Sequence, residues 1–275
     1  MAVPLAERHP VRVLLLAIAL LPIAVSCVDS QAPVELGFSL RNGNAPLSCT
    51  EIAGGLRLTD LRLYLYDLRL IDGAGRPAPF ELAPDEVWQD DRVALLDFED
   101  GQGACVNGSA EQNRSVRGTA SGGPFRGIAF TVGVPPDLNH RDPMTARAPL
   151  NYTAMHWHWL SGYKFMRVGV RSDSDSYWLH LGSSHCDGNV GAAIECRAPN
   201  RISVQLADFD PATNRIVIDI APLIAAGNLD DGTGSDCSSG PDEQACSGAF
   251  AALGLPFGDN TEQASQRIFR SEPAP

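Results

Sequence analysis

The chain is almost without lysine: Lys164 is the only one among 275 residues, and no block of basic residues stands out. Lysine and arginine together number 21 against 33 aspartate and glutamate residues, so the formal net charge is −12. Because binding to nucleic-acid phosphates requires a concentrated basic surface, this composition argues against nucleic acid as a partner. The acidic balance favours a role in solubility rather than in recognition.

The familiar catalytic motifs are missing as well. The sequence contains no G-x-S-x-G element, no Walker phosphate-binding loop and no H-E-x-x-H pair. Asp97 and Glu99 resemble an acid–base pair, and Ser161 or Ser184 could serve as a nucleophile near a histidine. No further feature supports these readings, and the two carboxylates are better explained as structural residues at a strand end. We therefore expect a protein that is not an enzyme.

No apolar run is long enough to cross a bilayer, which takes about 20 helical residues. The apolar run over 13–25 is shorter, follows basic residues and ends in Ser-Cys, which predicts a secretory signal peptide over residues 1–27. Its last four residues, Ala-Val-Ser-Cys, also resemble a bacterial lipobox, so Cys27 is a candidate for lipidation and membrane attachment. We expect a periplasmic or outer-membrane-anchored protein of a Gram-negative bacterium, with one mature domain over residues 28–275.

The six cysteines of this predicted mature domain lack the C-x-x-C spacing of a thiolate metal site. An even number of cysteines in an exported chain indicates disulfides instead. Short spacings favour Cys186–Cys196 and Cys237–Cys246 as local bonds, which leaves Cys49 with Cys105, although six cysteines allow fifteen pairings.

Helical patterns are few, and short strands separated by Gly, Pro, Asn and Asp dominate. The run Leu56–Leu70 alternates apolar with polar or small residues and closes at Asp72-Gly73 in the manner of a hairpin. Further strands are expected at Val34–Leu40, Val93–Phe98, Gly127–Val132, Ala154–Trp159, Phe165–Val170, Tyr177–Leu181, Arg201–Leu206 and Arg215–Ile220, and helices at Pro222–Ala226, Gln244–Leu253 and Thr261–Phe269. This pattern predicts an all-β, antiparallel sandwich-like single domain with few short helices.

The segment Met155-His156-Trp157-His158-Trp159 concentrates metal-binding residue types. In a strand over 154–159, Met155 and the two tryptophans would share one face, and the two histidines the other. The histidines could then hold a metal, or simply be solvent-facing polar positions. The opposite face looks like ordinary core, although methionine is also a soft ligand that suits Cu(I).

Ordered blocks along nearly the whole mature chain resemble the MbnP-like family, the four-Cys-motif member of the metallo-mystery pair linked to bacterial copper handling. The blocks are Phe38, Cys49, 61–64 (LRLY), 88–89 (WQ), 94–99 (ALLDFE), Cys105, Phe130, 133–135 (GVP), 138–140 (LNH), Met155, 157–159 (WHW), 162–165 (GYKF), 180–182 (HLG), Cys186, Cys196, Cys237 and Cys246. So many blocks in one order are far more specific than any single motif.

The resemblance implies a protein that holds one copper ion as Cu(I). It further implies that the first Trp of the W-x-W motif, Trp157, is oxidised to kynurenine with the help of a di-haem c-type protein of the peroxidase/MauG type. An unmodified indole offers one N–H donor and no acceptor, which explains why modification would come first.

The resemblance also implies ligands. His140 and His180 lie in the family-like blocks and are carried over as imidazole ligands. Met155 is a weaker candidate, because it shares the predicted strand face of Trp157. His156 and His158 depart from the family pattern and are candidates for additional metal ligands. The rival prediction is a binding or adhesion module whose exposed tryptophans contact a carbohydrate or a partner protein.

Overall fold

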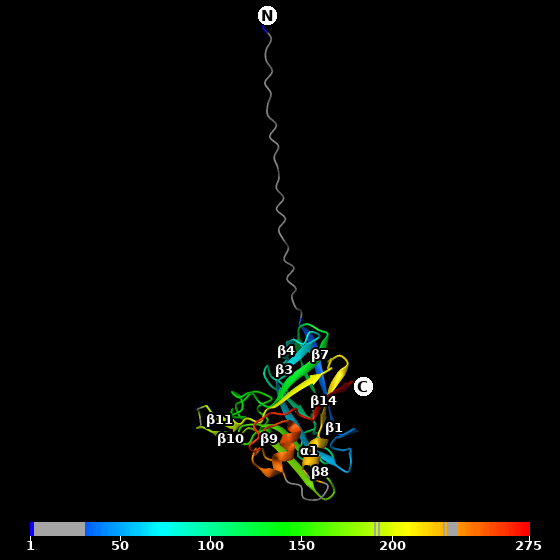
Figure 1. Ribbon diagram of the computed structural model, residues 1–275, viewed down its shortest axis with the longest axis vertical. Helices are drawn as coiled ribbons and strands as arrows, with labels where there is room; N and C mark the ends of the chain where they lie inside the picture. The colour runs from blue at the N-terminus through cyan, green and yellow to red at the C-terminus, as the bar shows by residue number, and fades with distance from the viewer. Residues whose placement is uncertain (3–30, 190, 192, 228, 230–235) are drawn as a thin grey trace.

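The computed structural model describes residues 1–2, 31–189, 191, 193–227, 229 and 236–275 (Figure 1). The predicted signal peptide, apart from its first two residues, and Cys27 lie outside the described residues. Among the helices that are described, none combines the length and apolar character needed to cross a membrane.

The described chain is mostly β-structure. Its elements, in chain order, are β1 Ala32–Asn42, β2 Ala45–Pro46, β3 Arg57–Asp72, β4 Pro77–Leu82, β5 Ala94–Asp97, β6 Ser115–Ala120, β7 Phe125–Val132, the 3-10 helix η1 Thr153–Met155, β8 Lys164–Arg171, β9 Ser176–Gly182, β10 Ser184–Asp187, β11 Glu195–Ala198, β12 Ile202–Ala207, β13 Asn214–Asp219, α1 Ala221–Ala226, the 3-10 helix η3 Gln244–Cys246, α2 Ser247–Leu253 and β14 Phe269–Pro273. Strands are found at all but one of the predicted positions.

Strand β3 organises the sheet because four strands pair along its length. Its first half pairs with β8 on one side and β5 on the other, and its second half pairs with β7 and β4. The change of partners falls beside Asp67, whose φ of +53° accompanies a shift of register between Tyr66 and Arg69. Such an irregularity bends a strand and increases its twist.

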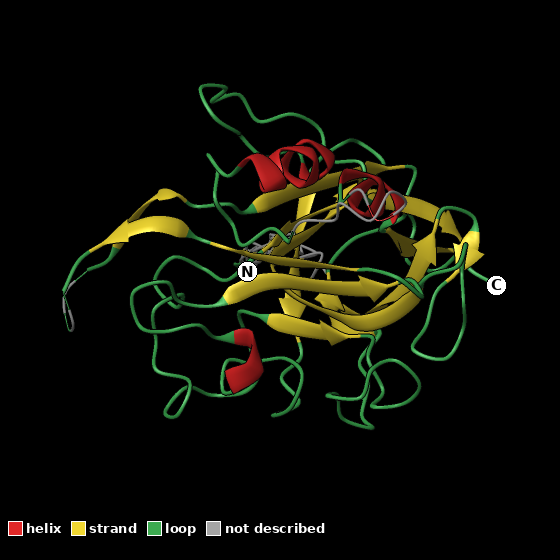
Figure 2. Ribbon diagram, turned by 90° about the horizontal axis from the view of Figure 1, so that it is seen from below, coloured by secondary structure: helices red, strands yellow, loops and turns green. Residues whose placement is uncertain are grey.

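The predicted antiparallel sandwich is wrong in its arrangement, although the mostly β, single-domain, disulfide-stapled character is correct. Twelve strands form one curled mixed sheet whose main path is β12-β7-β3-β4-β6-β1-β13-β14, closer to a half-barrel than to two stacked sheets (Figure 2). Strands β2, β5, β8 and β9 attach to the side of this path. Strands β1 and β13 pair in parallel, and β12 and β14, at the two ends of the order, approach one another. The apolar side chains therefore meet inside one curved sheet rather than between two flat ones.

Two short helices close one side of the core (Figure 2). Leu223 and Ile224 of α1 and Phe250 and Leu253 of α2 belong to the main apolar cluster. Three disulfides add covalent links: Cys49–Cys105, Cys186–Cys196 and Cys237–Cys246, the arrangement that the cysteine spacing favours. Two of the bonds are buried, whereas Cys186–Cys196 lies in the separate hairpin of β10 and β11.

The helix predicted at Thr261–Phe269 is wrong. Residues 261–266 have no regular structure, and Phe269 begins β14, which pairs with β13. The side-chain oxygen of Gln266 accepts hydrogen bonds from the backbone N–H groups of Ile268 and Phe269, so it leads the chain into the strand. Pairing with the sheet edge outweighs a weak local helical preference.

The carboxylates at the end of β5 belong to a buried charge cluster. Arg62 donates to both carboxylate oxygens of Asp60 at 2.9 and 2.7 Å and lies 3.6 Å from Glu99. Asp97 is fully buried, and its Oδ2 has no hydrogen-bond partner in the described structure. Burial raises the pKa of Asp97 to about 7 despite the opposing attraction of Arg62, and it also raises the pKa of Glu99.

We expect Asp97→Asn to flatten the pH dependence of stability. A carboxyl whose pKa is higher in the folded than in the unfolded chain contributes stability below pH 4, and that contribution disappears as the pH rises through about 7. Denaturant unfolding at several pH values measures this: the wild type should lose about 2 kcal/mol relative to the variant between pH 5 and pH 8. If stability changed with pH in the same way in the wild type and the variant, the raised pKa of Asp97 would be contradicted.

Candidate metal centre

The predicted strand Ala154–Trp159 does not form. Residues Thr153–Met155 make a turn of 3-10 helix, and a tight turn follows in which the N–H of Gly162 donates to the carbonyl of His158 at 2.8 Å. Gly162 has φ of +74°, and a Cβ there would lie 2.2 Å from the carbonyl oxygen of Asn139. Glycine is needed because the turn both enters the left-handed region and packs directly on another backbone. The alternation of faces assumed from the sequence therefore does not apply.

Trp157 packs against strand β9. Its backbone N–H donates to the carbonyl of Gly162 at 3.0 Å, and its ring lies on Gly182 so closely that a Cβ on that glycine would come within 2.5 Å of Cζ3. The ammonium of Lys164 lies 5.6 Å from the ring centroid and donates to the carbonyls of Ala154 and His156. The indole is therefore half-buried between a glycine surface and a cation.

His180 lies on β9 two residues before Gly182. Tyr177, Leu179 and Leu181 of this strand point into the core, so by alternation His180 and Gly182 share the other face, on which the Trp157 ring rests. The His180 Nε2 atom is buried and has no hydrogen-bond partner among the described residues. Burial, reinforced by the cations Arg167 and Lys164, lowers its pKa to about 4. The imidazole is therefore neutral at pH 7 and has an unused ring nitrogen.

His140 occupies a different environment. Its Nδ1 lies 3.1 Å from the carbonyl oxygen of Trp159, and its Nε2 lies 3.2 Å from the amide nitrogen of Asn139 and 3.6 Å from the sulfur of Cys196. Burial lowers its pKa below the ordinary value, so this ring is also neutral at pH 7. Its neighbours are thus a carbonyl, an amide and a disulfide.

The two histidines of the 155–159 segment, His156 and His158, lie in different environments. His156 is half-buried, packs edge-on against Tyr163, and lines a pocket of about 370 Å³ together with His140, Asp142 and Trp159. Its Nε2 is buried without a described partner. His158 is exposed, and its Nε2 lies 2.9 Å from the hydroxyl of Ser161. His156 therefore remains near other donor atoms, whereas His158 faces solvent.

Met155 is fully buried in an apolar cluster with Tyr64, Tyr163 and Phe165. This environment suits a packing role for the thioether, which fills irregular space well. The predicted ligands are thus divided among three environments: Trp157 with His180, His140 with the disulfide and His156, and Met155 inside the core.

The sequence did not single out Gly182 and Lys164 as parts of the site. Gly182 provides the surface on which the indole rests, and Lys164 pairs with it across β8 and β9. Lys164 stands in the family-like block 162–165 (GYKF), and Gly182 stands in the block 180–182 (HLG). The signal in the sequence was therefore that each residue belongs to a family-like block. The structure adds that the two blocks meet where β8 pairs with β9.

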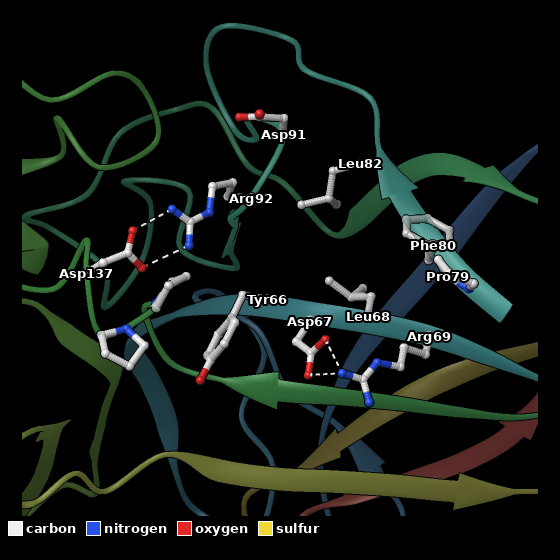
Figure 3. Close-up of a pocket in the computed structure, with 12 residues that line it drawn as sticks. Tyr66, Asp67, Leu68, Arg69, Pro79, Phe80, Leu82, Asp91, Arg92 and Asp137 are labelled. Carbon is white, nitrogen blue, oxygen red and sulfur yellow. Dashed lines mark hydrogen bonds and ion pairs between the residues drawn. The ribbon is translucent and has the colours of Figure 1, made fainter. Parts of the chain in front are cut away.

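A separate pocket of about 570 Å³ lies where β3 and β4 meet the loop after β7 (Figure 3). Four of its five charged side chains form two ion pairs, Arg92 with Asp137 and Arg69 with Asp67, and the fifth is Asp91. Because the four paired charges neutralise each other, Asp91 is the one charge of the lining outside these pairs, and a single carboxylate is not a metal-binding donor set.

Comparison with known proteins agrees with this fold. The family model described as MbnP matches residues 31–239. The chain belongs to the MbnP family. Among solved structures, MbnP from Methylosinus trichosporium is similar over 90% of this chain and 100% of its own, with a TM-score of 0.77 and 28% sequence identity. No curated protein sequence matches the chain.

Proposed function

We propose that this MbnP family member holds one Cu(I) ion beside Trp157 and His180, after Trp157 has been oxidised to kynurenine. The observation that carries the proposal is the buried Nε2 of His180, which lies on the strand face that the Trp157 ring covers and has no hydrogen-bond partner in the described part of the chain. A buried polar atom without a partner is costly, and a metal ligand is one reason for keeping it. Neutral imidazole is also the form that binds metals.

The charges around the site favour a monovalent ion. Lys164 and Arg167 are the cations that depress the pKa of His180, and Lys164 also lies over the Trp157 ring. Placing a cation beside them costs less for one unit of charge than for two, because Coulomb repulsion scales with the charge. Cu(I) is also the soft state that accepts nitrogen and sulfur donors readily.

Oxidation of Trp157 would change what its side chain offers. The indole has a single N–H donor, whereas kynurenine carries an aromatic amine and a ketone whose lone pairs can interact with a metal. We propose a di-haem c-type protein of the peroxidase/MauG type as the partner that supplies the oxidising equivalents. The role would be copper homeostasis in the periplasm or at the outer membrane, and the three disulfides support a location outside the cytoplasm.

The remaining predicted ligands are less favourably placed. The Nε2 of His140 contacts Asn139 and Cys196, and Met155 lies within apolar core. The rival prediction of an adhesion module needs an exposed tryptophan pair. Trp159 is 43% exposed, but Trp157 is half-buried against Gly182, so the pair does not form one contact surface.

Copper content and peptide mass mapping after co-expression with the di-haem partner test the proposal. The wild type should carry kynurenine at position 157 and one copper ion, and Trp157→Phe should carry neither. His180→Ala should retain the kynurenine but lose copper affinity by at least about tenfold, because a ligand is removed without touching the modified residue.

His158→Ala is the matched control, since it removes an exposed side chain whose one hydrogen-bond partner among the described residues is Ser161. This variant should bind copper as the wild type does. Unmodified Trp157 together with no copper uptake would overturn the proposal and leave the binding-module alternative. Full copper affinity in His180→Ala would reject His180 as a ligand.

A further inference from the structure

His140 and the Cys186–Cys196 disulfide form a cluster that the proposed copper site does not use. One ring nitrogen of His140 and the two sulfur atoms all lie within 4.8 Å of one another. We infer that reduction of this disulfide turns the cluster into a second metal site, in which two thiolates and the His140 imidazole hold a soft ion, Cu(I). The inference is independent of kynurenine and of the site at Trp157.

The imidazole is already oriented as a ligand. The backbone carbonyl of Trp159 can only accept, so the contact with Nδ1 at 3.1 Å places the ring proton on Nδ1 and leaves the Nε2 lone pair free to accept. That lone pair faces the sulfur of Cys196 at 3.6 Å. Histidine ligands commonly donate their other ring N–H to a backbone carbonyl in this way.

Asn139 fixes the second side of the ring. Its Oδ1 accepts from the backbone N–H of Tyr163 at 3.1 Å, so its amide N–H₂ points at the His140 Nε2, 3.2 Å away. A bound metal would take the place of this single hydrogen bond. The Asn139 amide therefore holds the His140 ring in place by a hydrogen bond to Nε2, and a metal ion would take the place of that amide on the Nε2 lone pair.

This disulfide is also the accessible one. Cys49, Cys105, Cys237 and Cys246 are at most 1% exposed, whereas Cys186 and Cys196 are both half-buried. The hairpin of β10 and β11 that carries them projects from the main sheet (Figure 2). A reductant can therefore reach Cys186–Cys196 while the other two disulfides stay protected.

The hairpin would keep the two sulfurs together after reduction. Cys186 and Cys196 are directly opposite one another, with Ser184 paired to Ala198 and Asp187 to Glu195 on either side. Cross-strand partners lie close enough for their side chains to interact without a covalent bond. Loss of the disulfide therefore leaves the two thiols facing the same histidine.

The chemistry balances with a dithiol as reductant. The dithiol closes to its own disulfide and passes two electrons and two protons to the S–S bond, which breaks to give two thiols. Binding of Cu(I) then displaces the two thiol protons to solvent, and the ion is held by two thiolates and a neutral nitrogen. Zn²⁺ prefers four ligands, and no carboxylate of the described residues joins this three-atom group. The donor set therefore favours Cu(I).

Anaerobic titration of the full chain, produced without a di-haem partner, tests the inference. Trp157 is first shown by mass to be unmodified, the protein is mildly reduced with a dithiol that is then removed, and thiol alkylation mapping confirms reduction at Cys186 and Cys196. Competition with a chromophoric Cu(I) chelator should then show uptake of one ion by the reduced protein and none at this affinity by the oxidised protein.

His140→Ala should weaken uptake by at least about tenfold in the reduced state, whereas His158→Ala should not change it. The double variant Cys186→Ser, Cys196→Ser keeps the four cysteines of the other two disulfides and should lose the uptake entirely. No uptake by the reduced wild type, uptake that survives in the double-serine variant, or undiminished Cu(I) affinity in His140→Ala would overturn the inference. A preference for Zn²⁺ over Cu(I) in the same titration would refute the inference that the reduced cluster is a Cu(I) site.

Discussion

Replacing Arg62 with alanine is expected to lower the free energy of unfolding by about 3–5 kcal/mol at pH 8, the cost of removing one partner from a buried ion pair. The Arg62 side chain is 4% exposed and lies among three carboxylates, Asp60, Asp97 and Glu99. Without the guanidinium, Asp60 keeps its ion pair with Arg167, at 2.9 Å, and Glu99 loses its ion pair with Arg62. Buried negative charge would then be left without compensation.

The cost should shrink as the pH falls. Asp97 and Glu99 already have raised pKa values because they are buried, and Arg62 is the cation that opposes this rise. Removing Arg62 raises both pKa values further, so the carboxyls can take up protons and become neutral in acid. Unfolding by denaturant at pH 5 and pH 8 should therefore show a smaller loss at pH 5.

Arg69→Ala provides the control. Arg69 pairs with Asp67 at 2.7 Å, but both side chains are about half exposed, at 51% and 46%. Exposed pairs contribute at most about 1 kcal/mol, so this variant should unfold nearly as the wild type does at both pH values. Equal losses for Arg62→Ala and Arg69→Ala would show that the buried cluster is not what stabilises this part of the sheet.

Much of the fold follows from local pattern. The alternation across Leu56–Leu70 identifies β3 because its leucines face the main core, although residues 60–65 are buried on both faces of the strand. Short strands elsewhere are marked by turn residues. The curl of the sheet is not visible in any single strand. It depends on the irregularity at Asp67 and on the parallel pairing of β1 with β13, residues far apart in the chain.

In the candidate site, too, local sequence identifies the motif, whereas long-range contacts decide which residues meet. The motif containing Trp157 is conspicuous in the sequence, but its strand pattern is misleading because Gly162 and Asn139 hold the segment in a turn. The partnership of Trp157 with His180 arises from tertiary packing on Gly182. Likewise, the contact of His140 with Cys196 joins residues 56 positions apart, so sequence spacing cannot reveal it.

Gly182→Ala is expected to reduce copper uptake at the proposed site by at least about tenfold and to destabilise the protein by about 1–3 kcal/mol. An added Cβ would lie 2.5 Å from Cζ3 of Trp157 and 2.6 Å from the backbone carbonyl oxygen of Tyr163. The strand cannot move away freely, because the Gly182 N–H donates to Ser239 and its carbonyl accepts from Asn200. The indole must therefore leave the face that it shares with His180.

Gly37→Ala is the matched control, since Gly37 is also a strand glycine but an added Cβ would meet nothing closer than 3.9 Å. Copper content and kynurenine formation are measured after co-expression, and stability is measured by denaturant unfolding. Together these measurements separate the loss of copper uptake from the loss of stability. Gly182→Ala should lose copper while remaining folded, and Gly37→Ala should match the wild type in both measurements. Undiminished copper in Gly182→Ala would mean that the site does not depend on the ring lying against β9. Because Gly182 supplies no donor atom itself and acts only by positioning the Trp157 ring, its variant tests the geometry of the site rather than its donor atoms.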